Sequence, residues 1–298
     1  MAKKIITKKE RLILMLLYIF RFLNSKQIQE FLNHKDHRRI NSWLKDLSNK
    51  KYIERDFKAI FGTLTKPAVY YLTALGRKDI KDGHDYYFPH YLKRISRDNK
   101  ASKAFRIRCQ ILADWYLMLF SNTEKNIENK DKSKVGIDIV DYMEIVLANS
   151  SKDYKDTIPL NKLQFFTPAH FPSFVLLEGI KPDAYLRKRT TKGVSHGLLF
   201  VLDAYIPRFL LRYTLKRIFD TLDEESWEDE SVHSLEIYFL CPNNMIITYC
   251  RRLLPSFLEK YYGSKPLEFR FATRNKLYNH KSGKTKEVGW LTISSSDY

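Results

Sequence analysis

The chain has only three cysteines among its 298 residues, Cys109, Cys241 and Cys250, and no two of them form a C-x-x-C pair. A disulfide framework needs paired cysteines, and a structural zinc site needs clustered ligands. The sequence predicts neither, and we expect the three thiols to be free and buried.

Long apolar runs are scarce too. Leu12–Phe20 follows several lysines and so imitates a signal peptide, but Glu10 and Arg11 flank it directly, and no small-residue cleavage site follows. The run is far shorter than the ~20 apolar residues that span a bilayer. We interpret it as the first core helix of a cytoplasmic protein that has no membrane partner.

Common catalytic motifs are missing as well. The sequence has no G-x-x-x-x-G-K-[ST], G-x-G-x-x-G, H-E-x-x-H or G-x-S-x-G, which are motifs of nucleotide binding, zinc proteolysis and serine hydrolysis. The nearest approach to a phosphate loop, Gly193–Gly197, lacks the lysine. The sequence therefore predicts no cofactor.

Positive charge, in contrast, is abundant. The formal net charge is +18, and residues 1–100 hold 23 lysines and arginines against 10 aspartates and glutamates, which is 13 of the 18 excess charges. A basic domain concentrates near a polyanion, and each phosphate that it neutralises releases counterions. This distribution favours a protein that binds nucleic acid over an ordinary basic protein or one that visits anionic membranes.

The basic region predicts three helices. Thr7 is expected to cap the first, whose apolar residues recur at helical spacing; Ser25 is expected to cap a short second helix, Lys26–Leu32; and the third covers about Asp36–Lys50. The apolar positions of the first helix are Leu12, Leu16, Ile19 and Leu23. In the third helix, Ile40, Leu44 and Leu47 form the buried face, and Arg38, Asn41, Ser42 and Lys45 form the opposite face.

The polar face of the third helix has the side chains that a recognition helix needs. Arginine pairs with guanine through two hydrogen bonds, asparagine does the same with adenine, and lysine and serine suit bases or phosphates. The competing interpretation is a solvated polar face, which most surface helices have.

Two β-rich runs follow, Tyr52–Phe61 and Ala68–Leu72, joined by the turn Gly62–Pro67. They predict a hairpin with a basic tip, and Thr73 is expected to cap a short helix after it. We expect the DNA backbone to be contacted by Lys26, Arg55, Lys58 and Lys66.

The residues Tyr70, Leu72, Thr73 and Gly76 fit the Y-x-L-T-x-x-G signature that closes the wing of many winged-helix proteins. Residues 1–80 therefore resemble a winged helix-turn-helix DNA-binding domain. Residues 81–134 are interpreted as a connecting helix, Ala101–Ser121, and a polar solvent loop, Asn122–Lys134.

Residues 135–298 read as alternating strands and helices, which predicts a mixed α/β sheet. A hairpin of Lys181–Arg187 and Gly197–Tyr205 encloses the loop Lys188–His196, and the acidic segment Asp223–Glu230 is expected to be a solvated loop. The remaining elements are the helix Phe209–Leu222, the strand Ser234–Cys241, the helix Ile246–Tyr262 and the strand Leu267–Ala272.

This order, with Pro182-Asp183 on one strand and the run Phe200 to Asp203 on the next, resembles the replication-relaxation family of plasmid and mobile-element proteins over Thr7–Lys276. The resemblance implies a restriction-endonuclease-like fold for the second domain. It also implies association with DNA replication and relaxation.

A nuclease of that fold needs two carboxylates that bind a divalent cation, and a lysine that helps to orient the attacking water. Asp183 and Asp203 supply the pair, but Tyr205 occupies the expected lysine position and Val201 the position of a glutamate. The pair is thus a structural or DNA-proximal remnant, a working Mg²⁺ site with a relocated lysine, or two ordinary strand-end carboxylates. We favour the remnant, and hence a catalytically degenerate domain.

The sequence therefore predicts a double-stranded DNA-binding protein that acts in replication or conjugative transfer of a plasmid or similar element. Other replication or transfer proteins and a second copy of the chain are further candidate partners. The alternatives are a winged-helix transcription regulator and a metal-dependent DNA endonuclease.

Overall fold

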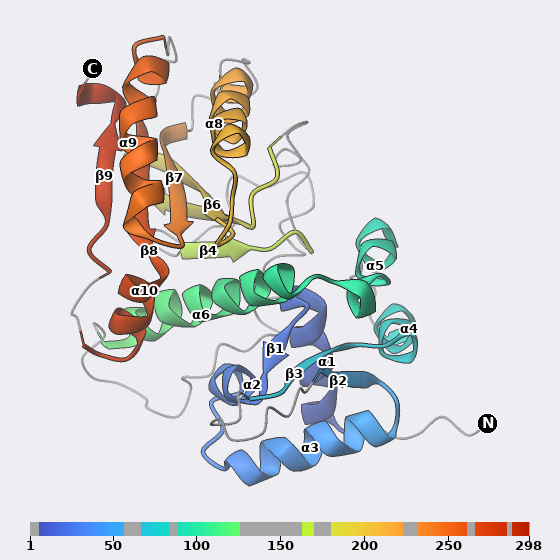
Figure 1. The fold of residues 1–298 in the computed structure, drawn as a ribbon. Coiled ribbons are helices and arrows are strands. Elements are labelled where there is room, and N and C mark those ends of the chain that lie inside the picture. The colour runs from blue at the N-terminus through green and yellow to red at the C-terminus, as the bar shows by residue number, and fades with distance from the viewer. Residues whose placement is uncertain are drawn as a thin grey trace, which may run out of the picture. The chain divides into compact units, whose positions relative to one another are not determined.

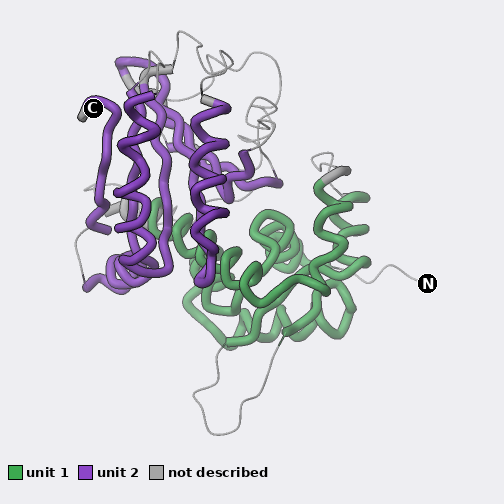
Figure 2. Tube along the Cα trace, turned by 45° about the horizontal axis from the view of Figure 1, so that its top comes forward, with its two compact units in different colours: residues 1–148 green, residues 149–298 purple. Residues whose placement is uncertain are grey.

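A computed structural model describes residues 6–56, 67–83, 89–125, 163–169, 180–222, 232–260, 266–284 and 288–297. The chain divides into two compact units, residues 1–148 (unit 1) and residues 149–298 (unit 2) (Figure 2). Within the described ranges, no helix has the length and apolar character that crossing a membrane requires.

Unit 1 is built from helices around a small sheet (Figure 1). The sheet is antiparallel and has the strand order β1-β3-β2. The elements are α1 (Lys8–Phe20), β1 (Leu23–Asn24), α2 (Ser25–Phe31), α3 (His37–Asn49), β2 (Ile53–Asp56), β3 (Val69–Leu72), α4 (Ala74–Gly83), α5 (Pro89–Ile95), the 3-10 helix η1 (Asp98–Lys100) and α6 (Lys103–Lys125).

Helix α1 forms the centre of unit 1. Thr7 caps it as predicted, because the Thr7 hydroxyl accepts the backbone N–H of Glu10 at 3.2 Å while the Glu10 carboxylate accepts that of Thr7 at 2.8 Å. Every residue from Ile13 to Phe20 is buried, as expected of a helix surrounded by other elements. The prediction that Leu23 belongs to this helix is wrong: the backbone turns at Arg21, whose φ is 66°, and Leu23 pairs with β3.

The predicted cap of α2 is also wrong by one residue. Asn24, not Ser25, accepts the backbone N–H groups of Lys26 and Gln27, both at 3.0 Å. A cap residue needs an extended backbone, which Asn24 already has as the last residue of β1. Ser25 is buried as the first residue of the helix.

The hairpin and the helix after it follow the prediction within the described residues. In the register of β2 and β3, Ile53 lies opposite Leu72 and Asp56 opposite Val69. Residues 57–66, which contain the predicted turn, lie outside the described residues. Thr73 caps α4 by accepting the backbone N–H of Gly76 at 3.1 Å.

Helix α6 completes the core of unit 1. Its Tyr116 ring packs against Phe20 of α1 and Phe31 of α2, with ring centroids 5.3 and 5.5 Å apart. The solvent loop predicted from Asn122 onward is wrong for residues 122–125, which continue α6. Polarity alone does not end a helix, and those four residues include no glycine or proline. Residues 126–134 lie outside the described residues.

Unit 2 contains a six-stranded mixed sheet in the order β4-β5-β6-β7-β8-β9, and the mixed α/β class predicted for it is confirmed. β6, β7 and β8 run parallel, and the other neighbours are antiparallel. The elements are β4 (Leu163–Phe166), β5 (Ala184–Thr190), β6 (Gly193–Val201), α8 (Arg208–Leu222), β7 (Val232–Cys241), α9 (Asn244–Leu258), β8 (Leu267–Thr273), α10 (Arg274–Lys281), β9 (Leu291–Ser294) and the 3-10 helix η4 (Ser295–Asp297).

Helices α8 and α9 cover one face of this sheet (Figure 1). Phe219 of α8 stacks on Phe257 of α9 and on Phe269 of β8, with centroids 5.2 and 5.5 Å apart. The free, buried state predicted for the thiols is confirmed for all three cysteines. Burial raises the pKa of Cys250 to about 12, so this thiol stays protonated at neutral pH.

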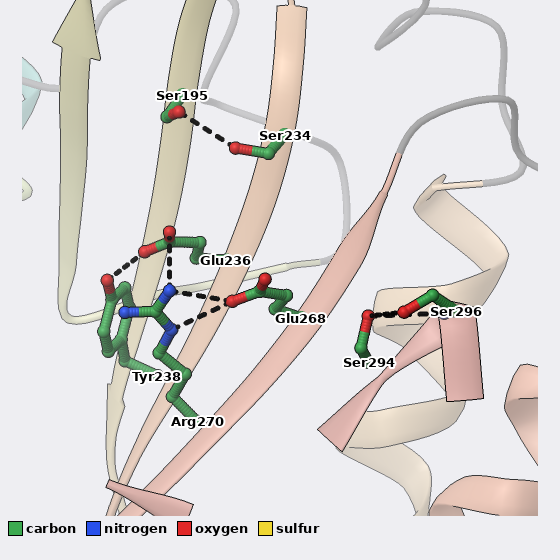
Figure 3. Close-up of polar contacts among 8 residues, drawn as sticks. All are labelled: Ser195, Ser234, Glu236, Tyr238, Glu268, Arg270, Ser294 and Ser296. Carbon is green, nitrogen blue, oxygen red and sulfur yellow. Dashed lines mark hydrogen bonds and ion pairs between the residues drawn. The ribbon is translucent and has the colours of Figure 1, made fainter. Parts of the chain in front are cut away.

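The opposite face of β7 and β8 has a polar ladder (Figure 3). The Arg270 guanidinium pairs with Glu236 at 3.0 Å and with Glu268 at 2.7 Å, and the Tyr238 hydroxyl donates to Glu236. Burial and the neighbouring Glu236 raise the pKa of Tyr238, which keeps this phenol a hydrogen-bond donor. The charged groups of the ladder are engaged with one another, and the ladder therefore belongs to the architecture of the sheet.

Two predictions for unit 2 need correction. The loop predicted for Lys188–His196 is wrong, because β5 and β6 continue through it to a two-residue turn, and a 2.6 Å hydrogen bond joins the Tyr185 hydroxyl to His196 Nδ1. Polar side chains are thus tolerated in the buried strands because they form hydrogen bonds with one another. The strand predicted to reach Tyr205 ends at Val201. Residues 223–230, the acidic segment, lie outside the described residues.

Candidate nucleic-acid interface

Helix α3 presents its predicted polar face to solvent. Ile40, Leu44 and Leu47 are buried against the rest of unit 1, whereas the predicted base-contacting residues, Arg38, Asn41, Ser42 and Lys45, are all exposed. Spacings of four and three residues place Arg38, Ser42 and Lys45 in one stripe along the helix. The stripe lies opposite the buried one and offers hydrogen-bond donors at each turn.

Two acidic residues at the ends of α3 have partners within the protein. Asp36 caps the helix by accepting the backbone N–H of Arg38 at 2.8 Å, and Asp46 pairs with Lys50 at 2.7 Å. Lys50 also pairs with the buried Glu10 of α1 at 3.1 Å, which ties the end of α3 to the start of α1. The hydrogen bonds that the Lys50 ammonium donates to Asp46 and Glu10 raise the pKa of Lys50.

Helix α2 is held on both sides. The Gln29 amide donates to the carbonyl of His34 at 2.9 Å and so fixes the turn between α2 and α3. The Gln27 amide donates to the Gln110 carbonyl at 2.8 Å and to Asp114 at 3.0 Å, both on α6. Lys26, in the first turn of α2, is exposed.

The base of the hairpin also has its acidic side chains engaged. Asp56 pairs with Arg106 of α6, and Glu54 accepts the hydroxyl hydrogen of Tyr71. Burial, followed by the Glu54 contact, raises the pKa of Tyr71 to about 12. Arg55, between these two carboxylates in sequence, is exposed. Lys58 and Lys66 lie outside the described residues.

Arg39 and Asn49 of α3 are also exposed, although neither is among the residues that the sequence predicts to contact DNA. Asn49 extends the stripe, since it follows Lys45 by four residues. That spacing was a usable signal for Asn49. Arg39 lies beside the stripe, where periodicity gives no indication of a role.

The predicted acidic pair of unit 2 lies beside the strands rather than on them. Asp183 directly precedes β5, and its carboxylate accepts the backbone N–H of Val201 at 2.8 Å. Asp203 follows the end of β6 and is half-buried. In the parts of the chain that the structure describes, no three His, Cys, Asp or Glu side chains form a cluster that could hold a metal ion. The Asp183 contact gives this carboxylate a role in joining the two strands.

Comparisons with known proteins match part of the chain. The family model described as replication-relaxation matches residues 14–134. A crystal structure of Bacillus subtilis PadR in complex with operator DNA is 15% identical, with a TM-score of 0.23, over 45% of this chain and 85% of that chain. No curated protein matches the chain. The family whose model matches residues 14–134 is the replication-relaxation family that the sequence resembles.

Proposed function

We propose that unit 1 is a winged helix-turn-helix that binds double-stranded DNA, with α3 as its recognition helix. The observation that carries the proposal is the exposed stripe of Arg38, Ser42 and Lys45, opposite the buried stripe of the same helix. Side chains of these types read base edges when their helix lies in the major groove.

The surroundings of α3 support this role. Two carboxylates of unit 1 are engaged within the protein, Asp46 of α3 by Lys50 and Asp56 at the base of the hairpin by Arg106, so each has a cationic partner before a phosphate approaches. Lys26 and Arg55 are exposed and suit backbone contacts, which position a protein without reading sequence. We assign Lys58 and Lys66 the same role.

The process that we propose is replication or conjugative transfer of a plasmid or similar element, in keeping with the replication-relaxation family. A transcription regulator with the same helix is the main alternative. In unit 2 we propose a nuclease-like domain that adds surface without cleaving DNA, because Asp183 is engaged by the backbone of Val201. Nicking of supercoiled plasmid with Mg²⁺ that Asp183→Ala abolishes would overturn that last point.

Footprinting on origin and promoter regions of the parent element tests the function. We expect protection at an origin, and loss of that protection in the double variant Arg38→Ala, Lys45→Ala. Each lost base contact should cost about 1 to 3 kcal/mol of binding free energy. The matched control, Lys93→Ala with Arg94→Ala, removes two exposed charges from α5 and should retain the footprint.

Protection of a promoter only, with a change of expression and no replication or transfer defect, would favour the regulator. Unchanged binding by the Arg38 and Lys45 variant would reject α3 as the recognition helix.

A further inference from the structure

Helix α8 of unit 2 exposes aromatic rings on its solvent face. Phe209 is 69% exposed and Tyr213 is 55% exposed, and Tyr205, just before the helix, is 95% exposed. Phe209 and Tyr213 are one turn apart, about 6 Å along the axis, and so project from the same side. The buried side of the helix is formed by other residues, among them Leu211, Leu215 and Ile218. The exposed rings therefore do not serve the core.

Cations alternate with these rings. Arg212 and Lys216 are exposed on the same side of α8, and the Arg217 guanidinium lies over the Tyr213 ring, 5.5 Å from its centroid. Asp220 is the one acidic residue of α8, one turn beyond Lys216. We call the set the α8 strip; it consists of Tyr205, Phe209, Arg212, Tyr213, Lys216 and Arg217.

The start of α8 is fixed to its neighbour. The Tyr249 hydroxyl of α9 donates to the Arg208 carbonyl at 3.4 Å, and the Arg208 guanidinium lies 5.5 Å from the centre of the Tyr249 ring. Phe219 holds the far end of the helix against α9 and β8. The strip is thus displayed on a rigid element, as a preformed binding surface requires.

We propose that the α8 strip binds single-stranded DNA. Aromatic rings offer surfaces on which unpaired bases stack, and interleaved arginines and lysines pair with the phosphates between them. Paired bases in a duplex already stack on each other and cannot use such rings. An apolar docking surface for a protein does not need a cation beside each ring, whereas a polyanionic strand does.

The choice of DNA over RNA rests on the function proposed for unit 1. A protein that holds a duplex through one unit and an unpaired strand through the other is suited to a junction where strands separate, as both replication and transfer require.

The full chain is tested by fluorescence anisotropy with labelled dT20, and with a labelled duplex that contains the footprinted site. In the double variant Phe209→Ala, Tyr213→Ala we expect at least about tenfold weaker binding of dT20, because each stacked base contributes substantially to affinity. Duplex affinity should stay within about twofold of the parent protein. Matched melting temperatures would establish that the variant is folded.

Two further variants separate stacking from apolar contact and from the proposed function. Phe209→Leu with Tyr213→Leu keeps apolar volume but removes the rings, and should bind dT20 as weakly as the alanine variant. Arg38→Ala with Lys45→Ala should weaken duplex binding and leave dT20 binding unchanged. A failure of the recognition-helix assignment in unit 1 can therefore be distinguished from a failure of the proposal for the α8 strip.

Equal dT20 affinity in the parent protein and in both ring-less variants would overturn the proposal. So would tighter binding of rU20 than of dT20, which would identify an RNA surface. Sedimentation that shows a dimer lost in the leucine variant would instead assign the strip to self-association, and would also overturn it.

Discussion

The backbone of Gly76 lies so close to the carbonyl oxygen of Tyr52 that a β-carbon at position 76 would overlap with that oxygen. Thr73 fixes this approach, because its hydroxyl donates to the carbonyl of Lys51 at 2.6 Å and accepts the backbone N–H of Gly76. Leu72 packs against the same point. The spacing of the Y-x-L-T-x-x-G signature thus joins the first turn of α4 to the start of the hairpin.

We expect Gly76→Ala to destabilise unit 1 by about 1 to 3 kcal/mol, since either the helix or strand β2 must move to admit the methyl group. Urea unfolding monitored by fluorescence measures the effect. The control Lys78→Ala changes an exposed residue of the same helix and should leave stability nearly unchanged. A Gly76→Ala protein as stable as the parent would contradict the close approach.

Periodicity was sufficient to predict α1, α3 and α6 of unit 1, whereas α5 was not predicted. In α3 the spacing of Ile40, Leu44 and Leu47 identified the buried face, and it thereby identified the exposed stripe as well. The cap of α2 was misassigned because both Asn24 and Ser25 favour cap positions in sequence. Only the pairing of β1 with β3 gives Asn24 the extended backbone that a cap needs.

The sheet of unit 2 was harder to predict because its strands contain polar residues whose partners are distant in sequence. The polar character of His196 predicted a loop. In the structure it lies in a buried strand, which accommodates it through a hydrogen bond with Tyr185. Strands β4 and β9 were not predicted at all. Both are four-residue edge strands, too short for an alternating pattern to stand out.

The pair Gln27 and Asp114 should couple α2 to α6. The Gln27 amide donates to Asp114 at 3.0 Å in a buried position and also closes the cap of α2 through Asn24. We expect Gln27→Ala to cost about 1 to 3 kcal/mol of unfolding free energy. In a double-mutant cycle with Asp114→Ala, the double substitution should cost less than the sum of the two single substitutions, by at least about 0.5 kcal/mol. Strict additivity would show that the contact contributes nothing to stability.

Alkaline pH should unfold unit 1 partly through Tyr71. Burial raises the pKa of this phenol from 10.0 to about 12, so the folded state favours the neutral form. The associated stability is fully present below pH 10 and is lost as the pH rises through about 12. Urea unfolding followed from neutral pH to about pH 12 should therefore show a shallower decline for Tyr71→Phe than for the parent protein. Parallel declines would mean that Tyr71 ionises equally in both states.

Arg270 should counter repulsion within the sheet of unit 2. Glu236 and Glu268 are direct neighbours on parallel strands, and the Arg270 guanidinium lies between their carboxylates (Figure 3). Because all three side chains are partly exposed, we expect Arg270→Met to cost only about 1 to 2 kcal/mol. Unfolding measured in low and in high salt should show a smaller penalty at high salt, where like charges are screened.

A variant of the Glu268 partner provides the control for that measurement. Adding Glu268→Gln to Arg270→Met removes one of the two like charges and should recover part of the lost stability. Arg251→Met, at an exposed position of α9, should be neutral. A salt-independent penalty would show that packing, not charge, is what Arg270 contributes.

Lys26 and Asn41 should affect DNA binding in different ways, because one is assigned to the backbone and the other to a base. Lys26→Ala should weaken binding to every duplex by a similar factor and lower the slope of log affinity against log salt by about 1, since one fewer phosphate is neutralised. Asn41→Ala should leave that slope unchanged and relax the preference for one adenine in the site. Both side chains are exposed, so neither change should alter the melting temperature. Titrations at several salt concentrations, on the footprinted site and on its single-base variants, would measure both effects. A salt slope that falls with Asn41→Ala would place this residue at a phosphate instead.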